Sequence, residues 1–128
     1  MPEETVIRQC APTLAGIKMG SLFSCEYDSL EELHEEIRNF NRKYGERGLS
    51  LIPLKYSKGR VLLYLYRPEG LRKDLQDELA QQLLKQEGYP LVSSGQCIVK
   101  LMRRLRNDGD FPHEIGLFLS YPPEEQPD

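Results

Sequence analysis

The fold is decided by residues 50–66, which read SLIPLKYSKGRVLLYLY. Ser50–Tyr56 and Arg60–Tyr66 are rich in Leu, Val, Ile and Tyr, and Ser57–Gly59 supplies a turn, so the stretch predicts a β-hairpin. The second strand carries apolar or aromatic side chains on both faces, which is typical of a central strand. Pro53 in the first strand indicates an edge position or a bulge, because proline cannot donate to a ladder.

The segments on either side of the hairpin predict the remaining elements. Ser21–Tyr27 is a short, mainly apolar stretch with strand-like alternation, and it predicts a strand. Ser29–Tyr44 predicts a helix, because Ser29 and Glu32 have the spacing of a capping box and apolar residues recur behind them at helical spacing. Helices are also expected over roughly Leu71–Gln86 and Gly95–Arg106, and a last strand over Ile115–Tyr121.

These elements predict an α+β fold of two layers. We expect a mainly antiparallel four-stranded sheet with about three helices, in the order β-α-β-β-α-α-β. The two terminal strands need neighbours, so Cys10–Cys25 and Phe111–Tyr121 are expected side by side, with His113 near Cys10–Gly20. The expected organisation is a flexible N-terminus over 1–9, a single domain over 10–121 and a Pro-rich acidic tail over 122–128.

Composition limits the class of protein. The chain has 128 residues, of which 39% are hydrophobic and 29% charged, and these values are typical of a soluble globular domain. The net charge of −3 is too small to indicate a polyanionic partner. There is no apolar run long enough to cross a membrane, and the polar start MPEETVIRQC does not resemble a signal peptide. We therefore expect a cytoplasmic protein.

The three cysteines Cys10, Cys25 and Cys97 allow two interpretations. They are either small buried apolar side chains or reactive thiols. Cys97 lies in the first turn of an expected helix, where the helix dipole would lower its pKa. A Cys10–Cys25 disulfide would need an oxidising compartment, which the sequence does not signal. No zinc site or other cofactor is expected, because the chain lacks a CxxC motif and its two histidines lie far apart.

His113 and Glu114 stand together in the loop before the expected last strand. A loop histidine beside a carboxylate suits a general base or a metal ligand, and with Cys10 or Cys25 it would have the parts for nucleophilic catalysis. The zinc-protease pattern H-E-x-x-H is not completed, because Leu117 occupies the second histidine position. The alternative is a turn histidine with Glu114 capping a neighbouring element.

Basic residues gather on the expected helix at 95–106. They complement the dipole at the end of that helix, or they form an anion or nucleic-acid patch: Lys100, Arg103, Arg104 and Arg106. His34 lies within a run of glutamates on the helix at 29–44, and this run is typical of a solvated face.

Two segments at the ends of the chain resemble a known family. They read CAPTLAGIKMGSLFSC from Cys10 and FPHEIGLFLSYPPE from Phe111, and the hairpin ending in Leu65–Pro68 is similar as well. Both end motifs look like signatures of the bacterial domain-of-unknown-function family numbered 3793. The resemblance implies a cytosolic bacterial protein without an established activity, some of whose relatives are encoded near ferrous-iron transport or flavodoxin genes. The family usually continues beyond the YPPE segment, whereas this chain ends at Asp128.

The resemblance also indicates where a site would lie. The polar members of the matched motifs are Cys10, Lys18, Ser21, Cys25, His113 and Glu114. We expect a small binding or regulatory protein that acts through protein contacts or self-association, since no complete catalytic signature is present. The alternatives are a thiol- or metal-dependent enzyme or iron-handling protein using Cys10 or Cys25 with His113 and Glu114, and, more weakly, nucleic-acid binding through the basic helix.

Overall fold

The computed structural model describes residues 3–90, 93–108 and 111–119, and the chain divides into two compact units. The first unit is Met1–Pro68 and the second is Glu69–Asp128. Each unit is described by itself, so the single domain expected over residues 10–121 stays a prediction. The expected tail at 122–128 lies outside the described residues.

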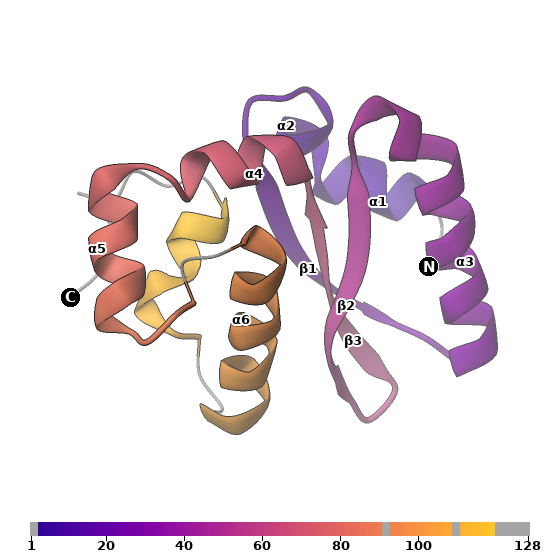
Figure 1. Cartoon of the computed structure of the whole chain (residues 1–128). Coiled ribbons are helices and arrows are strands. Elements are labelled where there is room, and N and C mark those ends of the chain that lie inside the picture. Colours follow the sequence, from indigo (N-terminus) through magenta and orange to yellow (C-terminus); the bar gives the residue numbers. More distant parts are fainter. Residues whose placement is uncertain (1–2, 91–92, 109–110, 120–128) are drawn as a thin grey trace. The chain divides into compact units, whose positions relative to one another are not determined.

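The first unit is built on a three-stranded antiparallel sheet. Its strands are β1 (Gly20–Glu26), β2 (Ser50–Ser57) and β3 (Arg60–Tyr66), in the order β1-β3-β2 (Figure 1). The central place predicted for β3 is confirmed. β2 and β3 are joined by Lys58 and Gly59, whose φ angles of +34° and +77° suit the tight turn of a hairpin.

A bulge in β2 decides which way its last residues point. β2 is an edge strand, and its register against β3 shifts between Pro53 and Lys55, so both expectations for Pro53 are confirmed. The inserted residue, Leu54, is fully buried. Because side chains alternate along a strand, the extra residue turns Tyr56 to the face that also carries Leu51.

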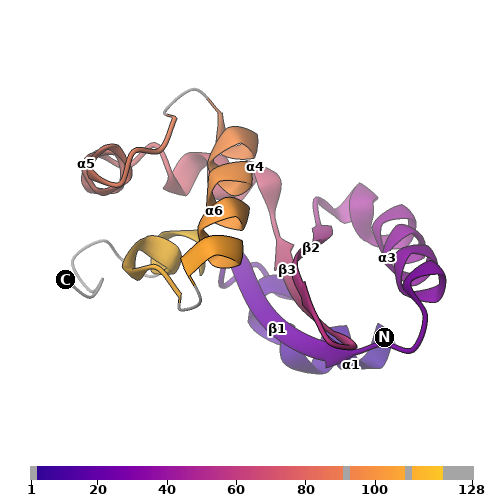
Figure 2. The same cartoon turned by 90° about the horizontal axis from the view of Figure 1, so that it is seen from below.

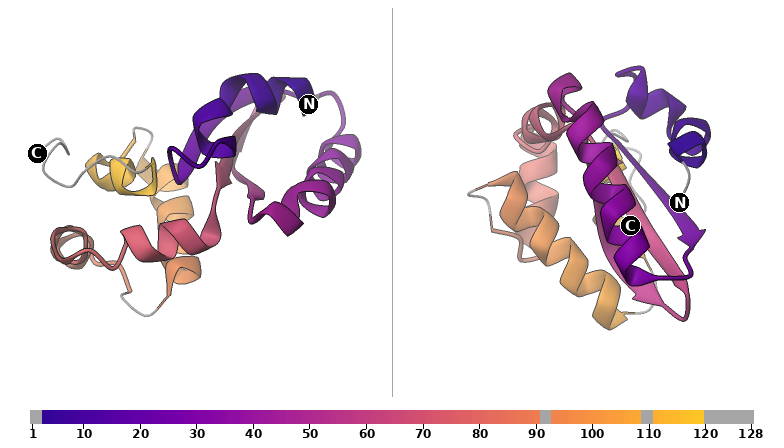
Figure 3. Two further views of the ribbon diagram at one scale, coloured as in Figure 1. Left: turned by 90° about the horizontal axis from the view of Figure 1, so that it is seen from above. Right: turned by 90° about the vertical axis from the view of Figure 1, so that its right-hand side faces the viewer.

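Helices of the first unit cover one face of this sheet. Figures 2 and 3 show α1 (Glu3–Gln9) and α3 (Leu30–Tyr44) on the same side, with α2 (Ala11–Leu14) following α1. α1 falls in the segment 1–9, which was expected to be flexible. The predicted start of α3 is confirmed, because the Ser29 hydroxyl accepts from the Glu32 N–H at 3.4 Å. A short 3₁₀ helix, η1 (Gly45–Arg47), follows α3.

The core of the first unit lies between these helices and the sheet. Helix side chains meet alternate residues of the strands, as the sequence pattern predicts: Val6, Cys10, Leu33, Ile37 and Phe40 against Phe23, Leu51, Val61, Leu63 and Leu65. Asn41 adds a polar contact beside this core. Its Nδ2 donates to the Leu51 carbonyl at 2.9 Å, and its Oδ1 accepts from the Leu51 N–H at 2.7 Å.

The described part of the second unit is helical. Its elements are α4 (Pro68–Asp74), α5 (Glu78–Gln86), α6 (Ser94–Asp108) and the 3₁₀ helix η2 (His113–Leu119). The single helix predicted over Leu71–Gln86 is wrong, because Asp77 interrupts it. The Asp77 carboxylate accepts from the N–H groups of Leu79 and Ala80 at 3.1 and 3.2 Å, and it thereby begins a new helix.

The predicted four-stranded sheet with about three helices is also wrong. The described residues contain three strands, six α-helices and two 3₁₀ helices. Residues 115–119 of the expected last strand belong to η2, and the rest of that segment lies outside the described residues. Three consecutive residues, Gly116, Leu117 and Phe118, are buried, so the alternation of a half-exposed strand is missing.

Candidate functional site

In the first unit, the structure brings together several polar residues of the first matched motif. The hydroxyl oxygens of Thr13 and Ser21 lie 2.6 Å apart, both residues are buried, and they join α2 to β1. Cys10 is fully buried at the start of α2, and the side chain of Ser21 hydrogen-bonds its thiol. Lys18 is close enough for its charge to act on the same thiol. The cluster therefore contains Cys10, Lys18 and Ser21, together with Thr13, which was not predicted.

The acidity of the thiols argues against nucleophilic chemistry. Burial raises the pKa of the Cys10 thiol to about 11, although Ser21 and Lys18 act in the opposite direction. Burial also raises the pKa values of Cys25 and Cys97. The lowering expected for Cys97 is wrong in direction, because the thiol is buried and donates to the Pro90 carbonyl at 3.1 Å. All three thiols are free and favour the protonated form at neutral pH.

Arg67 holds the backbone around this cluster in place. Its guanidinium donates to the carbonyls of Thr13 at 2.9 Å, Leu14 at 2.7 Å and Arg47 at 3.1 Å. Two of these carbonyls end α2, so the charge also complements the dipole of a helix terminus. Gly16 has a φ of +79°, which lets the chain turn back beside the guanidinium. The motif that begins at Cys10 therefore has a structural role, because Thr13, Leu14 and Gly16 fix the path of the backbone around Arg67.

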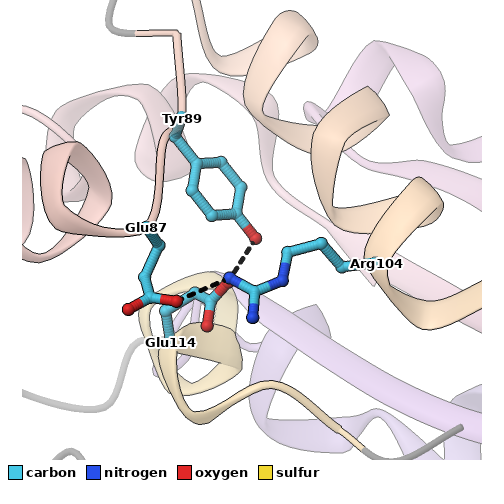
Figure 4. A network of polar contacts seen from close by, with 4 residues as sticks. All are labelled: Glu87, Tyr89, Arg104 and Glu114. Carbon is cyan, nitrogen blue, oxygen red and sulfur yellow. Dashed lines mark hydrogen bonds and ion pairs between the residues drawn. The ribbon is translucent and has the colours of Figure 1, made fainter. Parts of the chain in front are cut away.

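In the second unit, Arg104 and Glu114 meet in a buried polar network (Figure 4). Arg104 Nη1 lies 2.6 Å from Glu114 Oε2 and 2.7 Å from Glu87 Oε1. The Tyr89 hydroxyl donates to the same Glu114 oxygen at 2.7 Å. Glu114 is fully buried, and its second oxygen, Oε1, has no hydrogen-bond partner among the described residues.

This network joins three elements: Arg104 on α6, Glu114 on η2 and Glu87 at the C-terminal end of α5. The hydrogen bond to Glu87, helped by the charge of Glu114, raises the pKa of the Arg104 guanidinium. Burial and the bond to Glu114 raise the pKa of the Tyr89 hydroxyl. The Glu114 carboxylate already accepts two hydrogen bonds inside the protein. Such a group is better suited to holding the fold together than to acting as a general base.

The other predicted basic residues do not share the environment of Arg104. Arg103 and Arg106 are exposed, whereas Lys100 is half-buried with its ammonium near Gly88. His113 begins η2, and its side chain lies outside what the structure describes. The proposed meeting of His113 with Cys10 or Cys25 stays a prediction.

A small cavity of about 290 Å³ lies in the second unit at the start of α6. Cys97 forms part of its wall, and most of the other lining side chains are polar: Arg72, Gln76, Gln81, Ser93 and Ser94. The Ser93 hydroxyl is already used, because it accepts a hydrogen bond from the Gln96 N–H at 3.2 Å in the first turn of α6.

An exposed cluster on the first unit was missed by sequence reasoning. Here the rings of Tyr27 and Tyr56 lie edge to face with centroids 6.2 Å apart, and His34 approaches Tyr56 in the same way. His34 Nε2 is 3.0 Å from the Tyr56 hydroxyl. Leu30, one turn before His34, is 48% exposed and Tyr56 is 38% exposed. We call these four residues the aromatic patch.

Acidic side chains border the aromatic patch. Between residues 26 and 36 the chain has six acidic residues and no lysine or arginine: Glu26, Asp28, Glu31, Glu32, Glu35 and Glu36. The C-terminal half of α3 has the opposite charge, with Arg38, Arg42 and Lys43. The bulge at Pro53 is the signal that could have found the patch, since it turns Tyr56 toward α3.

The described residues meet neither the requirements of a membrane-spanning helix nor those of a metal site. None of the helices in residues 3–90, 93–108 and 111–119 combines the length and apolar character that a membrane crossing requires. Within the same ranges, no three His, Cys, Asp or Glu side chains are grouped so as to hold a metal ion.

The described units define an α+β protein with a three-stranded antiparallel sheet. The chain belongs to the family described as "Protein of unknown function (DUF3793)", whose model matches residues 6–125. The match covers almost the whole chain and confirms the resemblance carried by the two end motifs. No curated protein and no solved structure matches the chain significantly.

Proposed function

We propose that this chain is a small cytoplasmic binding or regulatory protein, and that the aromatic patch docks a basic segment of a partner protein. The observation that carries the proposal is the exposed contact of His34 with Tyr56, beside an exposed Leu30. Tyrosine is enriched at protein interfaces because it offers a large, rigid surface with a polar end. The three free cysteines are in keeping with a reducing compartment.

The charge around the patch supports a basic partner. Lysine or arginine side chains would meet the carboxylates of Glu31 and Glu35, which are exposed. Leu30 is 48% exposed, so covering the rest of its side chain would contribute roughly 1 kcal/mol, about half of the value for a fully exposed leucine. An apolar centre with a charged border is the usual anatomy of a protein interface.

The two alternative functions have less support. Thiol chemistry through Cys10 or Cys25 would need an accessible thiolate, and the pKa values of both thiols are raised. Nucleic-acid binding through α6 would need its basic residues on one surface, whereas Arg104 is engaged with Glu87 and Glu114.

Site-specific photo-crosslinking tests the proposal. Benzoylphenylalanine replaces Leu30, Tyr56 or, as the matched control, Ile17, which is 78% exposed in another part of the first unit. We expect one cross-linked product from positions 30 and 56 but not from 17, with a net positive charge in the attached segment. The product should be lost when Glu31→Lys and Glu35→Lys are added.

Three results would contradict this function. One is the absence of a product specific to positions 30 and 56. The second is the same product from Ile17, and the third is an acidic or uncharged cross-linked segment. Circular dichroism of each variant shows whether the substitutions leave the fold intact, which is expected because none of the replaced side chains belongs to the buried core.

A further inference from the structure

The outer surface of α3 carries its charges in a single row. Glu31, Glu35, Arg38 and Arg42 are separated by four, three and four residues, so they lie along one line of the helix. All four are exposed, and the buried residues of α3 lie on the opposite side. In the right panel of Figure 3, α3 lies in front of the sheet along its whole length. We call these four residues the charged row.

The charged row is complementary to itself when reversed. It reads acidic, acidic, basic, basic from the N-terminal end of α3. Two α3 helices side by side in opposite directions would therefore bring Glu31 of one copy to Arg42 of the other, and Glu35 to Arg38. Both pairs share one midpoint, between residues 36 and 37, so a single two-fold axis forms each pair twice.

The charges of the row have few partners inside the chain. Among the described residues, no hydrogen bond or ion pair involves the side chains of Glu31, Glu35 or Arg38. In the part of the chain that the structure describes, Arg42 donates only to the neutral Asn39 side chain, at 3.3 Å. By contrast, Lys43 on another side of the helix pairs with Glu3 at 2.8 Å. The row is thus available to a partner of complementary charge.

We infer that the basic segment which docks on the aromatic patch is the C-terminal half of α3 in a second copy of this chain. The inference rests on the proposed function and names its partner. The reversed pairing places Arg42 of one copy at Glu31 of the other, beside Leu30 and His34 of the patch. The interface is isologous, so both copies use the same surface. Because the pairs are exposed to solvent, the dimer dissociates as salt screens them.

A charge-swap experiment tests the pairing. The wild-type chain is compared by sedimentation equilibrium with Glu31→Arg/Glu35→Arg and with Arg38→Glu/Arg42→Glu, at about 0.02 M and about 0.5 M salt. We expect the wild type to dimerise at low salt, with a dissociation constant at least tenfold larger at high salt. Each variant alone should be monomeric, because its row then carries one sign of charge. An equimolar mixture of the two variants should restore a dimer.

A matched control separates the pairing from net charge. Glu4→Arg/Glu46→Arg changes the net charge as the first variant does, at exposed acids outside the row, and should dimerise like the wild type. A monomeric wild type at low salt, a variant that dimerises alone, or a monomeric mixture would each overturn the inference. If the wild type is monomeric while positions 30 and 56 still cross-link another basic protein, the proposed function stands and only the second copy is excluded.

Discussion

The side-chain amide of Asn41 makes with Leu51 the two backbone hydrogen bonds that a neighbouring strand would make. Its Oδ1 accepts from the Leu51 N–H and its Nδ2 donates to the Leu51 carbonyl. Leu51 lies in β2, an edge strand of the described sheet, where unpaired backbone groups invite pairing with another chain. A single helix residue thus closes part of that edge and fixes α3 against the sheet.

Replacing Asn41 should therefore destabilise the first unit. In Asn41→Leu the N–H and carbonyl of Leu51 lose their partners, and we expect the free energy of unfolding to fall by about 1 to 3 kcal/mol. Urea denaturation followed by circular dichroism measures the change. The control is Asn39→Leu on the exposed side of the same helix, where a change within about 0.5 kcal/mol is expected. Equal losses in the two variants would show that the pairing with Leu51 contributes nothing.

Arg67 should be difficult to replace even by lysine. It donates to three carbonyls, two at the end of α2 and one at the end of η1, and an ammonium group cannot reproduce this planar arrangement of donors. We expect Arg67→Lys to lower the free energy of unfolding by about 1 to 2 kcal/mol, and Arg67→Ala to lower it further. Arg60→Lys is the control, since the side chain of Arg60 makes an exposed ion pair with Glu26. A fully tolerated Arg67→Lys would refute the geometric role.

The network around Glu114 should respond asymmetrically to loss of its members. Arg104→Met leaves a buried carboxylate without its cation, and we expect a loss of about 3 to 5 kcal/mol in thermal or urea unfolding. Glu114→Gln should cost less, because Arg104 keeps Glu87. The double variant Arg104→Met/Glu114→Leu should recover part of the loss. Arg103→Met, exposed on the same helix, is the control, and a double variant less stable than Arg104→Met would contradict the ion-pair account.

The Cys10 thiol should make stability depend on alkaline pH. Folding raises its pKa to about 11, so the folded state binds this proton more tightly than the unfolded state. The resulting stability is fully present below the unfolded pKa and is lost as the pH rises through the folded one. Between pH about 9 and about 11, the free energy of unfolding of the wild type should fall by about 2 to 3 kcal/mol more than that of Cys10→Ala. This value follows because a pKa shift of one unit corresponds to about 1.36 kcal/mol. The free energy of unfolding is measured by urea denaturation at each pH. If it falls equally with pH in the two proteins, the Cys10 thiol does not contribute to the pH dependence.

Local signals made much of the first unit predictable. The hairpin, the bulge at Pro53 and the cap at Ser29 each depend on residues close together in sequence, whose backbone preferences are strong. The family was predictable as well, from the two end motifs. The contacts of Arg67 with Thr13 were beyond sequence reasoning, because 54 residues separate the two and no periodicity connects them.

The second unit was predicted less well for physical reasons. Leu71, Leu75, Leu79 and Leu83 repeat every fourth residue and suggest one uninterrupted helix, yet Asp77 begins a new helix and leaves Leu79 44% exposed. The apolar run at residues 115–119 is too short for its periodicity to separate a buried strand from a helix. The meeting of Arg104 with Glu114 depends on how α6 and η2 pack, which the sequence pattern does not encode.

The strand order β1-β3-β2 has a consequence for the growing polypeptide on the ribosome. β1 leaves the ribosome before β3, the strand with which it pairs, has been synthesised. Until β3 emerges, the backbone groups of residues 20–26 that pair with it must be satisfied by water or by another molecule. α3 and the β2–β3 hairpin, by contrast, form from adjacent residues and can assemble as soon as they appear. The first strand to be made must therefore wait for the last one, and in that interval its backbone is open to pairing with other molecules.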